Sequence, residues 1–190
     1  MIERLLRDVR KKLADHPERL RHTLGVYETA LELALIHGAD RRAVAIASLM
    51  HDYHRHDPIA ELTSGLDPDT VERYRKIPAI YHAIRASQTL RTVYGVTDSD
   101  TLNAVRYHVF GRPKMSLTER VVFVSDLAEP GRAFIDTKAL FDLAVRDIDL
   151  ACEKAMRIIM DYAITEGKEP DIEQLDAYRY YEEVNRGKTH

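Results

Sequence analysis

Residues 43–52 read Ala-Val-Ala-Ile-Ala-Ser-Leu-Met-His-Asp, an apolar run that ends abruptly in a histidine and an acid. Asp40 precedes the run as a helix N-cap, so we expect a helix from Arg41 to about Tyr53. A helix that is apolar on nearly every side is buried among other helices. Burying an unpaired carboxylate costs several kcal/mol, so Asp52 requires a cation or a metal beside it.

A second apolar segment has the same character. Val-Val-Phe-Val occupies residues 121–124, and Asp126 follows two positions later. Ser116 and Glu119 have the spacing of a capping box, which predicts a helix that runs through Ala128. Two buried helices are therefore expected to end in acidic groups.

Proline, glycine and capping residues divide the rest of the chain into further helices, and no stretch alternates with the two-residue period of a half-buried strand. Pro58 and residues 63–67 indicate a loop. Further helices are expected at residues 17–38, 68–77, 78–95, 137–146, 148–166 and 171–184. Another is expected to open at Asp98 or Asp100 and to stop at residues 111–113. The sequence predicts a single all-α domain over residues 1–190.

Composition limits the classes of function. The chain has 190 residues, 45% hydrophobic and 31% charged, with a net charge of −3, which does not favour nucleic-acid binding by general electrostatics. Residues 1–13 are charged throughout and lack the apolar run of a signal peptide, and no segment has the length of apolar sequence that a membrane span needs. A single cysteine, Cys152, forms no internal disulfide and is interpreted as a packing residue. We expect a cytoplasmic protein.

Three histidines fall on apolar helical faces, in addition to the one in the His51-Asp52 doublet. His22 has Val26 and Ala30 at four-residue steps, and His82 and His108 also have apolar neighbours at helical offsets. Each alone is more often a hydrogen-bonded core residue than a ligand. One metal centre explains the set better than separate coincidences do; its candidate ligands are His22, His51, Asp52, His82, His108 and Asp126.

The ligand types indicate which metals are suitable. Imidazole and carboxylate without thiolate suit iron, manganese, zinc, or magnesium with waters. Adjacent residues on a helix point about 100° apart, so His51 and Asp52 either converge on one point at the helix end or ligate metals in different ways. In the second case the histidine binds one metal while the carboxylate spans two, and two metals bind a phosphate and activate a water.

These residues resemble a known family. The spacing of His22, His51-Asp52 and Asp126 is similar to that of the HD-domain superfamily. Five segments resemble its YqeK-like branch of bacterial symmetrical bis(5′-nucleosyl)-tetraphosphatases, which split diadenosine tetraphosphate into two ADP. They are residues 21–26, 47–53, 103–108, 111–116 and 126–132, and the resemblance covers about 16–166. It implies an HD-domain helical bundle with a metal site in its core, the core lying at about 16–166 and a C-terminal helical extension at 167–190.

The resemblance implies an arrangement of the ligands. His22, His51, Asp52 and Asp126 would hold one metal, often iron. His82 and His108 would help to hold a second, with Asp52 bridging. We therefore expect one or two divalent metals, iron first, with manganese, zinc or magnesium as alternatives.

The expected reaction is hydrolysis of a dinucleoside polyphosphate, in which Asp52 or Asp126 orients the attacking water. Arg55, Arg112, Lys114 and Arg132 are the candidate phosphate contacts, because Arg112 and Lys114 follow His108 closely. Arg112 is also the candidate for stabilising the transition state.

Three residues depart from the family pattern: Arg55 stands where lysine is usual, Ala83 where glycine is usual, and Ser125 where alanine is common. These departures leave two alternatives open. The first is another nucleotide phosphohydrolase of the superfamily, such as a nucleotidase. The second is a metal-holding or nucleotide-binding module with weak turnover. A homodimer is also left open.

Overall fold

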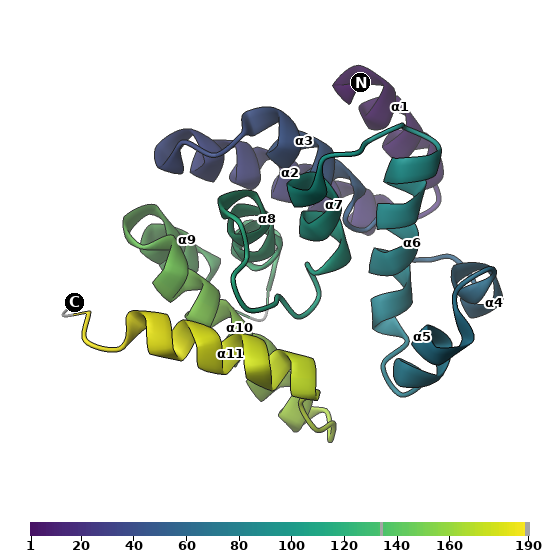
Figure 1. Cartoon of the computed structure of the whole chain (residues 1–190). Helices are drawn as coiled ribbons and strands as arrows, with labels where there is room; N and C mark the ends of the chain where they lie inside the picture. Colours follow the sequence, from purple (N-terminus) through teal and green to yellow (C-terminus); the bar gives the residue numbers. More distant parts are fainter. Residues whose placement is uncertain (134, 189–190) are drawn as a thin grey trace.

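The structure is a computed structural model that describes residues 1–188 except residue 134, and the described part contains helices and no strand (Figure 1). The helices are α1 (Ile2–Lys12), α2 (Pro17–His37), α3 (Arg41–Met50), α4 (Ile59–Thr63), α5 (Pro68–Arg73), α6 (Ala79–Thr92), α7 (Ser99–Arg106), α8 (Leu117–Ala128), α9 (Thr137–Arg146), α10 (Ile148–Thr165) and α11 (Ile172–Asn185). The predicted all-α class is confirmed.

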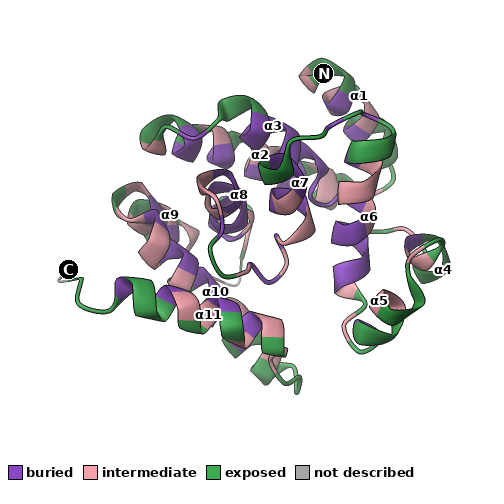
Figure 2. Ribbon diagram, viewed as in Figure 1, coloured by how far each residue is buried: buried purple, intermediate pink, exposed green. Residues whose placement is uncertain are grey.

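Helix α3 lies at the centre of the bundle, where it packs against α2, α7 and α8. Every residue from Ala43 to Met50 is buried, and Figure 2 shows this helix almost wholly in the buried colour. The Asp40 side chain accepts hydrogen bonds from the backbone N–H groups of Arg42 and Ala43, as expected for its N-cap position. The apolar sequence therefore places the end of α3 deep in the protein.

Helix α8 packs against α2, α3 and α7 and brings a second acid to the same region. Its predicted capping box is present: Ser116 Oγ accepts from the Glu119 N–H, and the Glu119 carboxylate accepts from the Ser116 N–H. Residues 121–124 are all buried, as the apolar run predicts.

Helices α1 and α4 were not expected. Leu5, Val9 and Leu13 recur at four-residue steps and are buried, so hydrophobic periodicity was a usable signal for α1. Helix α4 is five residues long and falls inside the segment interpreted as a loop. Helix α7 ends at Arg106, earlier than the predicted end near Gly111.

Two hydrophobic clusters stabilise the bundle. The main cluster includes Cys152, a packing residue as predicted, and also Ala177 and Tyr181 of α11. The smaller cluster lies beside α4, α5 and α6; its buried members are Leu62, Tyr74, Ile80, Tyr81, Ile84 and Phe110. None of the described helices has the length and apolarity required to span a membrane.

Candidate metal centre

The doublet lies where α3 ends. His51 is the C-cap residue of α3 with right-handed helical backbone angles, so the helical turn continues into Asp52. The His51 Nδ1–H donates to the carbonyl oxygen of Ser48 at 2.7 Å, which fixes the ring and leaves Nε2 to face inward. Both side chains are buried, at 0% and 4% residue exposure.

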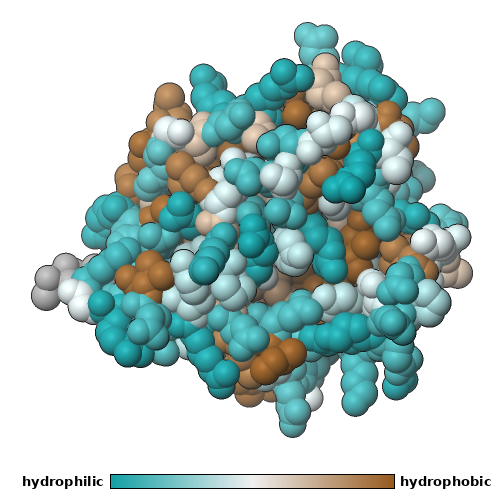
Figure 3. All heavy atoms as spheres, in the orientation of Figure 1, coloured by the Kyte–Doolittle hydropathy of each residue, from teal (hydrophilic) through white to brown (hydrophobic). Residues whose placement is uncertain are grey.

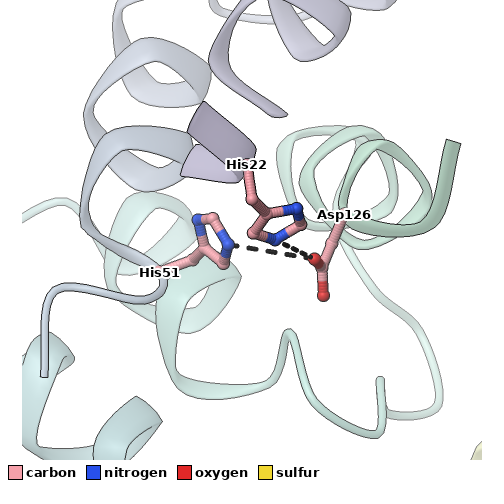
Figure 4. Close-up of side chains that lie close together, drawn as sticks. All are labelled: His22, His51 and Asp126. Atoms are coloured by element: carbon pink, nitrogen blue, oxygen red, sulfur yellow. Dashed lines mark ion pairs between the residues drawn. The ribbon is translucent and has the colours of Figure 1, made fainter. Parts of the chain in front are cut away.

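The first group of ligating side chains comprises His22, His51 and Asp126, from α2, α3 and α8 (Figure 4). His22 Nε2 lies 2.9 Å from Asp126 Oδ1, and His51 Nε2 lies 3.8 Å from the same oxygen. Burial alone raises the pKa of Asp126, but Arg132, His22 and His51 together hold that pKa far below the usual carboxyl range. Asp126 is therefore an anion at neutral pH.

The second group comprises Asp52, His82 and His108. The two histidine Nε2 atoms are 3.1 Å apart, and His82 Nε2 is also 3.1 Å from Asp52 Oδ1. The His108 Nδ1–H donates to the Val105 carbonyl, so its Nε2 has a lone pair that can accept from His82 or ligate a metal. Burial, aided by the charges of His82 and His51, lowers the pKa of His108 to about 3, so the ring is neutral.

Asp52 lies between the two groups. Its Oδ2 atom is 3.4 Å from His51 Nε2, while Oδ1 faces His82 and lies 3.9 Å from His108 Nε2. Arg19, which the sequence reading did not single out, donates to Oδ2 at 2.7 Å. Burial alone raises the pKa of Asp52, but His51 and His82 bring it well below its usual value. Each oxygen of one ionised carboxylate therefore faces a different group.

The surroundings of the His51 ring indicate whether a metal fits this site. Its Nε2 is fully buried and has no hydrogen-bond partner among the described residues. Because Nδ1 carries the proton, the lone pair of Nε2 points toward the carboxylate oxygens of Asp52 and Asp126. Lone pairs that face one another in a buried site need a cation between them. The donor set, imidazole and carboxylate, suits a divalent transition metal.

A cleft of about 880 Å³ opens over both groups. Arg55 and Arg132 line it, as do three cations that the sequence analysis missed: Arg19, Lys76 and Lys168. Apolar side chains also line it, including Phe110 and Ile159. Three acids outside the metal groups line it too: Glu166, Glu169 and Asp171. The remaining surface on the face in Figure 3 is mostly hydrophilic with scattered hydrophobic patches.

Two predicted phosphate contacts lie elsewhere. Arg112 and Lys114 are absent from the residues that line the cleft. The Arg112 guanidinium donates to both carboxylate oxygens of buried Glu119, at 2.7 and 2.6 Å. This bidentate pair ties the 111–116 loop to the start of α8, so the structure gives Arg112 a structural partner rather than a position over the metal groups. Lys114 has a backbone φ of 56°, in the left-handed region.

Glu129, one turn beyond Asp126, was also missed. It is 4% exposed, and its Oε1 accepts from His22 Nδ1 at 2.9 Å. Its Oε2 accepts from the Gly131 N–H at 2.7 Å. The available signal was a second acid three residues after Asp126, directly after the buried helix α8.

Comparison with known proteins places this geometry in a family. The model of the HD domain matches residues 19–131. The chain is 35% identical over 160 residues to the symmetrical bis(5′-nucleosyl)-tetraphosphatase of Bacillus subtilis, covering 83% of this chain and 85% of that protein. It is 30% identical over 148 residues to the enzyme of the same name from Staphylococcus aureus, covering 75% and 74%.

A solved structure is similar over nearly the whole chain. It is the crystal structure of a predicted HD superfamily hydrolase from Clostridium acetobutylicum, which superposes with a TM-score of 0.86 at 27% identity. The alignment covers 97% of this chain and 98% of that one, so α1 and α11 lie within the shared fold.

Proposed function

The chain belongs to the HD-domain family of hydrolases, and we propose that it is a symmetrical bis(5′-nucleosyl)-tetraphosphatase that converts diadenosine tetraphosphate into two ADP. The observation that carries the proposal is the position of Asp52, with one carboxylate oxygen facing each of two metal-capable groups at a cleft lined by both basic and acidic side chains. The names of the relatives support the choice of substrate.

The ligand assignment follows from the two groups. His22, His51 and Asp126 would hold one metal and His82 and His108 a second, with Asp52 between them. Iron is the proposed metal, with manganese, zinc and magnesium as the alternatives that the donor set also suits. When bound, two such metals polarise a phosphoryl oxygen and lower the pKa of a water.

The cationic side chains that line the cleft would contact the phosphates of the substrate. Arg19 and Arg55 lie on the Asp52 side and Arg132 on the Asp126 side, where they would offset charge on the phosphates as it increases in the transition state. Lys76 and Lys168 line the cleft as well and would hold a further phosphate. Cleavage at the middle of a tetraphosphate requires contacts on both sides of the reacting phosphorus, and these five cations are the candidates for those contacts.

The roles of Arg112 and Lys114 as phosphate contacts remain sequence-based predictions. The cleft supplies other cations in the positions that those two residues were expected to fill. A nucleotide substrate also agrees with the expected cytoplasmic location, and a homodimer remains open.

The proposal is tested by incubating the purified protein with Fe²⁺ or Mn²⁺ and a panel of nucleotides. We expect diadenosine tetraphosphate to be hydrolysed faster than ATP, ADP or AMP, and a chelator to abolish turnover. Preference for a mononucleotide would instead favour a nucleotidase of the same family. Metal binding without turnover of any nucleotide would favour a binding module.

A further inference from the structure

Glu129 has no assigned role, yet it is built into the first metal group. Its carboxylate accepts from His22 Nδ1 at 2.9 Å, on the side of the ring opposite the atom that faces Asp126. A histidine that binds a metal through one nitrogen must carry its proton on the other, and an acceptor at that second nitrogen fixes the tautomer and the ring plane.

Two glycines make room for this carboxylate. A Cβ at Gly25 would lie 2.8 Å from Glu129 Oε2, and a Cβ at Gly131 would lie 2.9 Å from the same oxygen. Gly25 lies inside α2, where glycine costs roughly 0.5–1 kcal/mol relative to alanine, so helix stability does not explain its presence. The Gly131 N–H also donates to Oε2 at 2.7 Å. The Gly131 N–H therefore holds the carboxylate, and the absence of a side chain at Gly25 leaves the space that it occupies.

We propose that Glu129 is a positioning residue: it holds the His22 imidazole in the orientation and tautomer that a metal ligand at Nε2 requires, and Gly25 and Gly131 form its cradle. The inference rests on the proposed metal-binding role of His22. It adds that affinity for the metal depends on a residue that does not itself contact the ion.

Substituting Glu129 by glutamine alters the tautomer and orientation of His22 without removing any proposed metal ligand. If the amide oxygen keeps its bond to the Gly131 N–H, the amide NH₂ group faces His22 Nδ1 and favours the tautomer with the proton on Nε2. That tautomer cannot ligate. Loss of such a partner typically weakens metal affinity about 10- to 100-fold.

The measurement is a calorimetric and optical titration of the metal-free protein with Co²⁺. We expect Glu129→Gln to weaken one Co²⁺ site about 10- to 100-fold and to leave the site of His82 and His108 unchanged. Glu119→Gln is the matched control, since Glu119 is a buried glutamate near the other end of α8 that contacts no ligand, and its Co²⁺ affinity should equal that of the wild type.

Gly25→Ala is the second variant, which keeps the test valid if Glu129→Gln fails to fold. The added methyl group meets only the flexible end of the Glu129 side chain at under 3.0 Å, so it should displace the carboxylate without unfolding α2. We expect a folded protein with weakened Co²⁺ binding. Wild-type affinity in both folded variants overturns the positioning role while leaving the proposed function intact. Absence of Co²⁺ binding in the wild type overturns both.

Discussion

At the residue scale, a substitution of Asp126 tests whether its carboxylate is a metal ligand or an ordinary acidic group. Its oxygen lies 2.9 Å from His22 Nε2, and its side chain is 13% exposed. Asp126→Ala removes the one carboxylate of the first group, so we expect metal content and turnover to be lost together. Elemental analysis and an activity assay on the same preparation provide the measurement, and a variant with full metal content and full rate would exclude this ligand role.

Arg112 requires a test that separates catalysis from folding. Arg112→Ala leaves Glu119, which is 1% exposed, without its partner; because Arg112 itself is 31% exposed, we expect a loss of about 1–3 kcal/mol, less than for a fully buried pair. Denaturant unfolding should show this loss. The double variant Arg112→Ala with Glu119→Gln removes the stranded charge, so it should recover much of the stability.

The same pair of variants addresses the predicted catalytic role. From the bidentate contact with Glu119, we expect the stable double variant to turn over at close to the wild-type rate per folded molecule. A stable double variant that is about a hundredfold slower, the loss typical of one transition-state contact, would instead support the role predicted from the sequence.

At the element scale, capping stabilises α7, the helix that directly precedes His108. Asp98 is the N-cap of α7, and its carboxylate accepts from the Thr101 hydroxyl at 2.6 Å and from the Thr101 N–H at 2.8 Å. These bonds lower the pKa of Asp98, with the Thr101 side chain as the larger cause. Asp98→Ala should cost about 1 kcal/mol at neutral pH.

The stabilisation by the Asp98 cap depends on pH, and its direction follows from the lowered pKa. Because the folded pKa is depressed, the stabilisation is fully present above the unfolded carboxyl pKa of about 3.9 and is lost as the pH falls through the folded value. The difference in unfolding free energy between wild type and Asp98→Ala should therefore shrink below pH 4. Asp98→Asn, which retains an acceptor oxygen and does not titrate, is the control; an unchanged difference at low pH would contradict the assignment.

Helices with strong local signals could be predicted from the sequence, and those that depend on distant partners could not. The Asp40 cap and the Ser116–Glu119 box gave α3 and α8 correctly. The six ligands could be proposed because buried histidines and acids are unusual, and the structure brings them into two adjoining groups. Arg19 was missed because nothing local distinguishes a surface cation from one that bonds across 33 residues. Glu129 follows a buried helix, but its sequence position alone does not reveal a partner 107 residues away.

At the scale of the whole molecule, the C-terminal helix belongs to the main core. Tyr181 of α11 is 2% exposed and packs in the same cluster as Phe123 of α8. Tyr181→Ala should therefore destabilise the protein by about 3–5 kcal/mol, the range for a large buried aromatic. Tyr180→Ala, at a half-buried neighbour, should cost clearly less in the same thermal or denaturant unfolding experiment. Equal small losses in both would indicate that α11 is a separable appendage, as the predicted extension at 167–190 allowed.

The central claim is that two metal groups sharing Asp52, at a cleft lined by both basic and acidic side chains, direct attack to the middle of a dinucleoside tetraphosphate. The most direct measurement is chromatographic separation of the products when the Fe²⁺- or Mn²⁺-loaded protein hydrolyses diadenosine tetraphosphate. The account predicts ADP as the single early product, at two molecules for each substrate consumed. ATP and AMP in equal amounts would contradict it.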